Sequence, residues 1–335
     1  MNMNEKTDKI DIVIPWVDGG DPAWQAEWRK VVCGDGQDNR VIRYRDWGIL
    51  KYWFRGVEKN LPWVNKVYFV TWGHIPQWLN VQCDRLCVVN HRDYIPEKYL
   101  PVFSSHPIEM NFHRINGLSE HFIYANDDMY FTMPLEKEFF FKNGLPVDSA
   151  IQNVLQFSRK DGINHIIAND LSYLNLNFNK REAMKKNRKK WFAPAYGKAA
   201  FQNLYLLPFA NFTGFHDPHL PYSYLKSTFS EVWNKCGDIL DMTCKHHVRS
   251  NEDVNQWLCR YWQFATGSFE PSSPTRGRFF VIGKDDDEIE KALLSNSIPM
   301  VCLSDDDEGV SFEKEKDFLI SCFEKILPEK SQFEL

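Results

Sequence analysis

Four short apolar runs mark the first half of the chain. They lie at residues 10–14, 67–70, 86–89 and 122–125, and each has the length and the β-branched or aromatic content of a buried strand. Polar or turn-forming residues follow each run closely. The hydrophobic pattern therefore predicts four short buried strands.

Amphipathic segments separate these runs. Asp21 is suited to cap a helix and Pro22 to occupy its first position, so we expect a helix over about 23–32. Apolar residues at helical spacing predict two more helices, over about 46–59 and 105–118. The alternation indicates βαβ units and predicts an α/β fold with a mainly parallel sheet flanked by helices. Ligands of such sheets bind beyond the carboxyl ends of the strands.

The pattern changes near residue 145, where Asn143-Gly144-Leu145-Pro146 interrupts it. We therefore expect an α/β core at 10–145, a helical and irregular insert at 146–265, and an α/β tail at 266–335. Within the tail we expect strands at 279–282 and 300–303 and helices at 288–294 and 312–327.

Composition limits the class of protein. The 335 residues include 40 basic and 45 acidic side chains, a net charge of −5, which argues against a nucleic-acid partner. No apolar run reaches the roughly 18 residues needed to span a bilayer, and no signal peptide is expected at the polar N-terminus. Eight scattered cysteines without a paired zinc motif are typical of a reduced, cytoplasmic protein.

A dense run of Lys and Arg occupies residues 180–190 and leads into Trp191-Phe192. It is either a solvated helix face or a basic surface for a phosphate or an anionic, lipid-linked acceptor. The chain is also rich in aromatic residues, with 12 Trp, 13 Tyr and 25 Phe. They give weak support for sugar binding, because most aromatic side chains serve the core.

Asn126-Asp127-Asp128 follows the fourth predicted strand directly. Two adjacent carboxylates at a strand end suit a divalent cation held against a diphosphate, and hard oxygen ligands favour Mg²⁺ or Mn²⁺ over zinc. The structural alternative is a capped strand end with surface acids. From the triplet alone, both interpretations stay open.

A glycine turn follows the first predicted strand. Asp18 and Asp21 flank Gly19 and Gly20, and glycines let backbone N–H groups approach a phosphate or a ribose. A tight turn with a helix cap explains the same residues. Neither GxxxxGK[ST] nor GxGxxG is present, so the P-loop and Rossmann motifs are absent.

His and Arg residues supply further candidates. His113-Arg114 precedes the strand of the acid pair and either binds phosphate or packs in the core. His216 and His219 form the richest histidine cluster, which suits a metal or a general base on an acceptor hydroxyl. Arg249 opens a polar stretch that includes Asn251 and Asp253, which is equally consistent with a helix start.

Four segments in this order resemble the conserved blocks of the Stealth family of sugar-phosphate transferases. They include the motifs DIVIPWVDGGDP, FSSHPIEMNFHRINGLSEHFIYANDDMYF and His219-Leu220-Pro221, and they cover Asp11–Pro22, Arg43–Leu79, Phe103–Phe131 and His219–Trp257. The resemblance implies a glycosyltransferase-A-like, nucleotide-sugar-binding sheet. It also implies transfer of a whole sugar-1-phosphate from a nucleotide-sugar, such as a UDP-hexose or UDP-N-acetylhexosamine, to an acceptor hydroxyl.

The product of that reaction is a phosphodiester, and a nucleoside monophosphate is released. The resemblance implies a lipid-linked oligosaccharide as acceptor, Mg²⁺ or Mn²⁺ as cofactor, and a cytoplasmic protein with peripheral contact at the inner face of the membrane. It also assigns donor-binding residues, with the two arginines being either phosphate ligands or structural: Trp16, Asp18, Gly19, Arg43 and Arg55.

The same resemblance assigns a catalytic centre. It implies that Asp127 and Asp128 are the metal and catalytic acids, that His219 is the general base, and that Arg249 steadies transition-state charge. His216 also precedes x-Pro, so the base is ambiguous between the two histidines. The resemblance places further residues beside this centre: His113, Arg114, Asn251 and Asp253.

Two other functions remain open from the sequence. A metal-dependent glycosyltransferase would use a similar acid pair and would release a nucleoside diphosphate. A non-catalytic carbohydrate-binding protein would bind sugar without turnover. The sequence does not identify the sugar, the acceptor hydroxyl, the oligomeric state or the role of 266–335.

Overall fold

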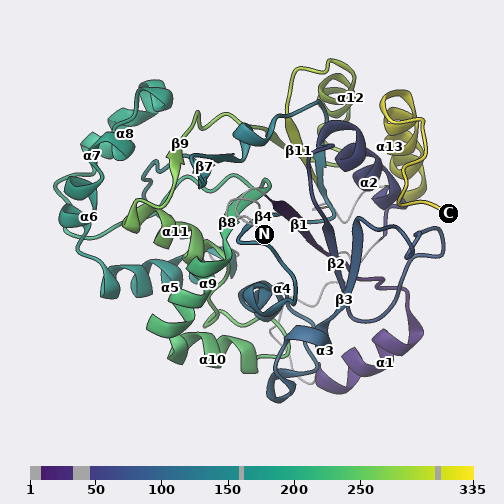
Figure 1. The fold of residues 1–335 in the computed structure, drawn as a ribbon, viewed down its shortest axis with the longest axis horizontal. Coiled ribbons are helices and arrows are strands. Elements are labelled where there is room, and N and C mark those ends of the chain that lie inside the picture. The colour runs from purple at the N-terminus through teal and green to yellow at the C-terminus, as the bar shows by residue number, and fades with distance from the viewer. Residues whose placement is uncertain (1–8, 33–45, 158–161, 306–310) are drawn as a thin grey trace, which may run out of the picture.

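The computed structural model describes residues 9–32, 46–157, 162–305 and 311–335 (Figure 1). Its centre is a five-stranded sheet in the order β3-β2-β1-β4-β8. The first four strands are parallel, and β8 runs antiparallel to β4. The strands are β1 (Ile10–Pro15), β2 (Val67–Thr71), β3 (Leu86–Asn90), β4 (His121–Tyr124) and β8 (Tyr222–Leu225).

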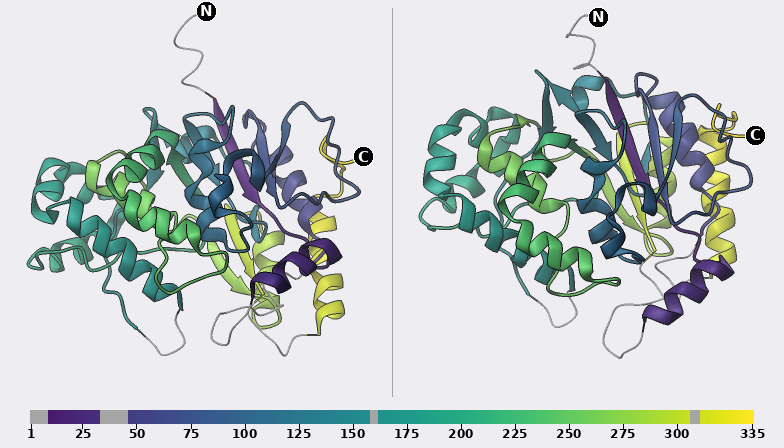
Figure 2. Two further views of the ribbon diagram at one scale, coloured as in Figure 1. Left: turned by 90° about the horizontal axis from the view of Figure 1, so that it is seen from below. Right: turned by 60° about the horizontal axis from the view of Figure 1, so that its bottom comes forward.

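The four predicted strands and the α/β class are confirmed. The strands are short, and β1, β2 and β4 are almost entirely buried because both faces of the sheet are covered. Ile12 and Ile14 face one core, with Trp53 of α2 (Leu50–Asn60) and Phe323 of α13 (Phe312–Ile326). Val13 faces the other core, which the helices of 162–266 complete (Figure 2).

The cap predicted for the first helix is confirmed. Helix α1 spans Pro22–Val31, and the Asp21 side chain accepts from the N–H groups of Ala23 and Trp24 at 2.7 and 3.2 Å. This contact supplies an acceptor to two N–H groups that lack partners within the helix.

Two predicted helices are shorter than expected. Helix α2 begins at Leu50 rather than 46, because Gly48 adopts a φ of +69° and donates its N–H to the Asp46 carboxylate. The helix predicted over 105–118 ends early as α4 (Ser105–Met110), followed by a 3₁₀ turn at Phe112–Arg114. The Asn111 side chain donates to the Pro107 carbonyl at 2.8 Å, at the junction of the two segments.

Two small sheets join the regions expected from the sequence. One has the order β10-β11-β5 and the other β6-β7-β9. The tail strands β10 and β11 thus pair with β5, directly after the acid pair, and β8 from the insert completes the central sheet. Whether 10–145, 146–265 and 266–335 fold as separate units stays a prediction. The added strands are β5 (Met129–Phe131), β6 (Phe141–Lys142), β7 (Leu145–Asp148), β9 (Glu270–Pro271), β10 (Arg278–Val281) and β11 (Met300–Ser304).

The insert is mainly helical, and the tail contains the predicted helices. No helix in the described parts of the chain is long and apolar enough to cross a bilayer. The seven described cysteines are free thiols. The remaining helices are α3 (His91–Tyr94), α5 (Gly162–Asn177), α6 (Lys180–Lys186), α7 (Arg188–Trp191), α8 (Ala200–Tyr205), α9 (Lys226–Lys235), α10 (Gly237–Lys245), α11 (Trp257–Thr266) and α12 (Asp286–Leu294), with 3₁₀ turns at Glu97–Tyr99, Lys137–Phe139 and Pro194–Ala199.

Candidate active site

A cavity of about 490 Å³ lies beyond the carboxyl ends of β1 and β4, where the parallel topology predicts a ligand site. Its wall contains residues from segments far apart in the chain. Of the candidates that the sequence singled out, five line it: Trp16, Asp127, Asp128, His219 and Arg249.

The acid pair occupies the turn between β4 and β5. The Met129 N–H donates to the Asn126 carbonyl, and the Leu303 N–H of β11 donates to the Asp128 carbonyl at 2.9 Å. The pKa of Asp127 is raised to about 7, because desolvation by the surrounding protein and the charge of Asp128 both disfavour its ionised form. A cation bound at the acid pair would offset this unfavourable charge.

The two oxygens of the Asp128 carboxylate have different surroundings. Oδ2 lies 3.5 Å from Nε2 of His219 and accepts from the Cys302 thiol at 3.4 Å. Oδ1 is buried and has no hydrogen-bond partner among the described residues. One oxygen thus faces the imidazole, and the other stays available for a ligand.

Asp128, His219 and Cys302 bring three potential metal-ligand atoms within 4.8 Å of one another. Burial and the charge of Asp128 hold the pKa of the Cys302 thiol well above its usual range. In the structure the Cys302 thiol donates to Asp128. The acid pair offers carboxylate oxygens, which suit Mg²⁺ or Mn²⁺.

The protonation of His219 depends on the same carboxylate. Desolvation opposes the charged imidazole, but the hydrogen bond and the charge of Asp128 outweigh it, so the pKa of His219 is raised. An imidazole beside a carboxylate, open to the cavity, has the geometry of a general base.

A buried ion network holds the loop that carries His219. Arg260 of α11 is fully buried and donates to both oxygens of Asp148, at 2.7 and 2.9 Å. It also donates to Asp217, whose other oxygen accepts from the Tyr261 hydroxyl at 2.6 Å. Because Asp217 lies two residues before His219, the network fixes the start of the catalytic loop.

The structure distinguishes the two candidate histidines by position. His216 is exposed and does not line the cavity, although its backbone N–H donates to the Ile151 carbonyl at 2.9 Å. Desolvation and the charge of Arg260 lower the pKa of His216. Only His219 of the two reaches the acid pair.

The residues of the polar stretch that begins at Arg249 lie in different environments. Arg249 lines the cavity and donates to the Ser105 hydroxyl at 3.2 Å. Asp253 is fully buried behind the wall, where it accepts from His106 at 2.8 Å and from His246 at 2.6 Å. Asn251 is exposed, outside the cavity wall.

The glycine turn after β1 lies at the edge of the cavity. Its Trp16 forms part of the wall, whereas Asp18, Gly19 and Asp21 do not. The Asp18 N–H donates to Nε2 of His74 at 2.8 Å, and Asp21 lies 3.3 Å from Nδ1 of the same ring. In the structure, these acids orient the turn and cap α1.

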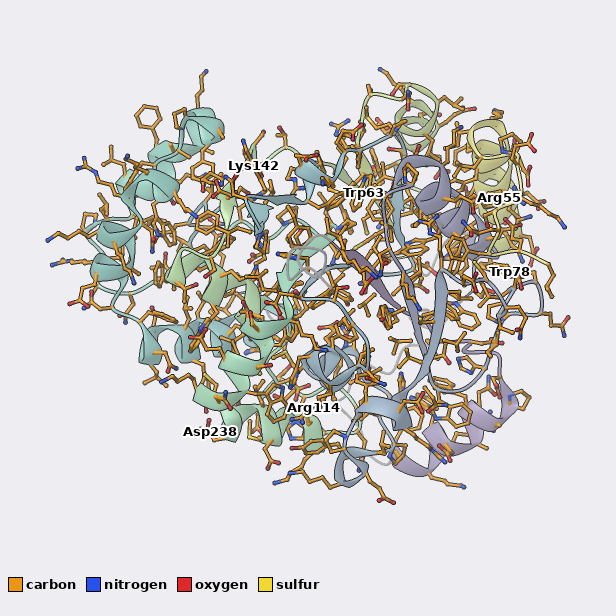
Figure 3. The ribbon with its side chains drawn as sticks, in the orientation of Figure 1. Arg55, Trp63, Trp78, Arg114, Lys142 and Asp238 are labelled. Atoms are coloured by element: carbon orange, nitrogen blue, oxygen red, sulfur yellow. The ribbon has the colours of Figure 1, made fainter. Side chains whose placement is uncertain are left out.

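Three predicted cationic candidates lie elsewhere: His113 and the two arginines labelled in Figure 3, Arg55 and Arg114. Arg55 donates to the Glu334 carboxylate at 2.9 and 2.8 Å and to the Leu327 carbonyl at 2.8 Å, so it anchors the C-terminus. His113 packs against Phe229 and Trp233, and the Arg114 guanidinium lies 4.8 Å from the Trp233 ring centre. None of the three lines the cavity, so the structure does not support substrate binding by Arg55 and His113 or catalysis by Arg114. Arg43 lies outside the described residues.

The cavity also contains a carboxylate that the sequence interpretation missed. Glu109 of α4 is buried in the wall and accepts from the Tyr124 hydroxyl at 2.8 Å through Oε1. Its Oε2 is buried and has no partner among the described residues. The available signal was an acid on an apolar helix face, which is rare unless the acid has a use. Other polar wall residues that were missed are His91, His106, Asn255 and Gln256.

An acid pair, a histidine and an arginine line one cavity at the carboxyl edge of the parallel sheet, an arrangement suited to an enzyme that acts on a phosphorylated ligand. The chain matches Stealth protein conserved region 1 over residues 8–35 and Stealth protein conserved region 2 over residues 43–148. Region 2 includes both Arg43–Leu79 and Phe103–Phe131, so these segments form one conserved region, not two.

Full-length relatives agree with this match. The chain is 39% identical to a capsular polysaccharide phosphotransferase WcwK of Streptococcus pneumoniae, over 98% of each chain. It is 39% identical to the receptor polysaccharide phosphotransferase WefC of Streptococcus oralis, over 98% of this chain and 99% of the relative. It is 38% identical to the exopolysaccharide phosphotransferase cps2G of Lactiplantibacillus plantarum, over 97% and 96%. The chain belongs to the Stealth family of polysaccharide phosphotransferases.

Solved structures give only distant matches. The galactosyltransferase LgtC matches with a TM-score of 0.37 and 8% identity, over 93% of this chain and 95% of LgtC. The glycosyltransferase GlyE of Streptococcus pneumoniae matches with a TM-score of 0.37 and 12% identity, over 97% and 66%. We draw no argument from similarities of this size, and the glycosyltransferase-A-like architecture stays a prediction.

Proposed function

We propose that the protein transfers a sugar-1-phosphate from a nucleotide-sugar to a hydroxyl of an oligosaccharide acceptor. The observation that carries the proposal is the Asp128 carboxylate in the cavity wall: Oδ2 lies beside His219, and Oδ1 has no hydrogen-bond partner among the described residues. The proposed base for the acceptor hydroxyl, His219, and a carboxylate that can hold a cation against the donor diphosphate, Asp128, thus lie side by side. The relatives' names support polysaccharide phosphotransfer.

The cofactor in this proposal is Mg²⁺ or Mn²⁺, held by Asp127 and Asp128. The unpartnered Oδ1 of Asp128 and the raised pKa of Asp127 both fit a bound cation, since a divalent ion would satisfy the first and relieve the second. Such an ion would neutralise diphosphate charge and stabilise the departing nucleotide.

His219 acts as the base in the proposed reaction. It removes the proton of the acceptor hydroxyl, whose oxygen then forms a bond to the phosphorus next to the sugar. The bond from that phosphorus to the bridging oxygen breaks, and the nucleoside monophosphate leaves with the bond electrons. Arg249 faces the charge that builds on the phosphoryl oxygens, a role suited to its guanidinium.

The donor and acceptor belong to the same proposal. A UDP-hexose or UDP-N-acetylhexosamine is the expected donor, with Trp16 lining its pocket beside the turn of Asp18, Gly19 and Asp21. The expected acceptor is a lipid-linked oligosaccharide at the cytoplasmic face of the membrane. We assign acceptor contacts to the cavity-lining residues of 146–265, because these include both His219 and Arg249.

The released nucleotide tests the proposal. Purified protein is incubated with Mg²⁺ or Mn²⁺, a panel of UDP-sugars and GDP-mannose, and an oligosaccharide acceptor, and the products are resolved by mass spectrometry. We expect UMP and an acceptor that gains a hexose and a phosphate. Release of UDP with gain of a hexose alone would instead establish a glycosyltransferase, and sugar binding without turnover would establish a lectin-like protein.

A further inference from the structure

An apolar face points outward from the helices at one edge of the molecule, remote from the cavity. Helices α6, α7 and α8 lie together at the left edge of Figure 1. In α8, Phe201 is 69% exposed, Leu204 54% and Tyr205 79%. Their spacing of three and four residues places them on one face of the helix.

The protein holds this face outward through the opposite side of α8. Asn203 is fully buried, and its amide donates to the carbonyls of Ala150 and Trp191 at 2.8 and 2.7 Å. Its side-chain oxygen accepts from the N–H of Gln152 at 2.8 Å. Because these contacts fix the rotation of α8, its three large apolar side chains are presented to solvent by the fold itself.

Helices α6 and α7, which lie beside α8 in Figure 1, carry a run of cations. Within 180–190, Glu182 is the only acidic residue. Two lysines of the run serve the fold, since Lys180 donates to the Leu206 carbonyl at 2.7 Å and Lys190 to the Phe269 carbonyl at 2.6 Å. The other cations of the run, and Lys198 nearby, are exposed. In the described part of the chain none of them lies within ion-pair distance of a carboxylate. They are Arg181, Lys185, Lys186, Arg188, Lys189 and Lys198.

We propose that α6, α7 and α8 form a docking surface for a lipid bilayer that contains anionic headgroups. Aromatic and leucine side chains on a short helix suit shallow insertion at the level of the headgroups, and flanking Lys and Arg add attraction to anionic lipid. A second copy of the chain is a poorer occupant. A symmetric dimer through this face would bring two cationic clusters together, and like charges repel.

This assignment refines the expectation for the basic run. The run leads into Trp191, but this side chain is fully buried and its ring stacks on Phe212, with 5.6 Å between the ring centres. The apolar anchor is α8 instead, which the sequence did not single out. The surface lies outside the cavity, so it can be tested without turnover and independently of the proposed reaction.

Vesicle co-sedimentation of the full chain tests the surface. Vesicles are made of phosphatidylcholine alone or with about 30% phosphatidylglycerol, an anionic lipid. We expect binding to the anionic vesicles only, with loss of binding at high salt. The triple variant Phe201→Ser/Leu204→Ser/Tyr205→Ser and the variant Lys185→Glu/Lys186→Glu/Lys189→Glu should each bind about tenfold or more weakly.

Matched controls exclude general effects of these changes. Ile75→Ser/Val81→Ser removes exposed apolar side chains elsewhere, and Lys137→Glu/Lys142→Glu/Lys235→Glu reverses exposed charges elsewhere, so both should bind like the wild type. All four variants should keep wild-type activity on a water-soluble acceptor.

Three results would overturn the proposal. They are absence of wild-type binding to anionic vesicles, undiminished binding by the α8 triple variant, and a wild-type dimer in sedimentation velocity that the triple variant converts to a monomer. The last result would show that a second copy covers the face.

Discussion

Two histidines from family motifs, His219 and His113, have opposite environments. His219 lines the cavity beside the Asp128 carboxylate, and its pKa is raised. His113 packs between Phe229 and Trp233, next to Arg114. Burial and the Arg114 charge lower the pKa of His113 to about 4. A partner of opposite charge makes one imidazole a proton acceptor, and its absence keeps the other neutral and structural.

The contrast also applies to the arginines. The guanidinium group of Arg260 forms an ion pair with Asp148, and that of Arg55 with Glu334, so both arginines stabilise the fold. Arg249 reaches the cavity. Residue type and motif alone do not separate these roles, whereas the partners and the open surface do.

Removing the cavity histidine should have the largest effect. His219→Ala removes the proposed base and should lower the rate of sugar-phosphate transfer by ~10²–10⁴. His216→Ala is the matched control, because His216 is exposed and lies outside the cavity, and it should stay near wild type. An inactive His216→Ala with an active His219→Ala would reverse the assignment of the base.

The second-largest effect is expected from replacing Asp128, the acid beside His219. Asp128→Asn removes both the charge beside His219 and the proposed cation ligand, so the transfer rate should fall by about two orders of magnitude or more. Asp238→Asn, an exposed acid on α10, serves as the control in steady-state assays across Mg²⁺ concentrations. Near wild-type kinetics with full metal dependence in Asp128→Asn would exclude Asp128 from the metal site.

The network behind the catalytic loop should have an intermediate effect. Asp217→Asn replaces a carboxylate that contacts both Arg260 and Tyr261, which should cost about 1.5–3 kcal/mol in the free energy of unfolding. Chemical denaturation measures this loss. The transfer rate should also fall, because His219 would be misplaced. Tyr261→Phe should lower both the stability and the transfer rate, but by less. Unchanged stability would show that the network is not needed to hold the loop.

Replacing His113 should change the stability of the folded protein at acidic pH rather than the transfer reaction. Since the pKa of folded His113 is depressed to about 4, its unfolded form binds protons first, and stability is lost as pH falls from about 6.5 towards 4. His113→Phe should weaken this pH dependence in denaturation experiments while the transfer rate at neutral pH stays near wild type. A lost transfer rate in a fully stable His113→Phe would return this residue to the catalytic centre.

The sequence predicted local structure better than long-range contacts. The first strands and the α1 cap follow from nearby residues, such as Asp21 and Pro22. At the early end of α4 the Asn111 side chain bonds to the Pro107 carbonyl, a contact that periodicity does not reveal. The partner of Arg55 lies 279 residues away, so no local pattern could show that this cation is structural.

The candidate site shows the same limit. Asp127 and Asp128 were predictable because they end a buried strand, and His219 and Arg249 entered through the family resemblance. Glu109 was missed, because an acid in a short apolar segment gives a weak local signal. Cys302 was missed because β11 pairs with β5 only in the folded chain. Spatial convergence of such residues is the information that the sequence lacks.

The position of the transferred phosphorus tests the central claim most directly. A UDP-sugar carrying radioactive phosphorus next to the sugar is incubated with the protein, Mg²⁺ and acceptor, and the products are separated. We expect the label in the acceptor, unlabelled UMP in solution, and strongly reduced transfer by Asp128→Asn and His219→Ala. Label that remains in released UDP while the acceptor gains an unlabelled sugar would contradict phosphotransfer and show that the anomeric bond is the one broken.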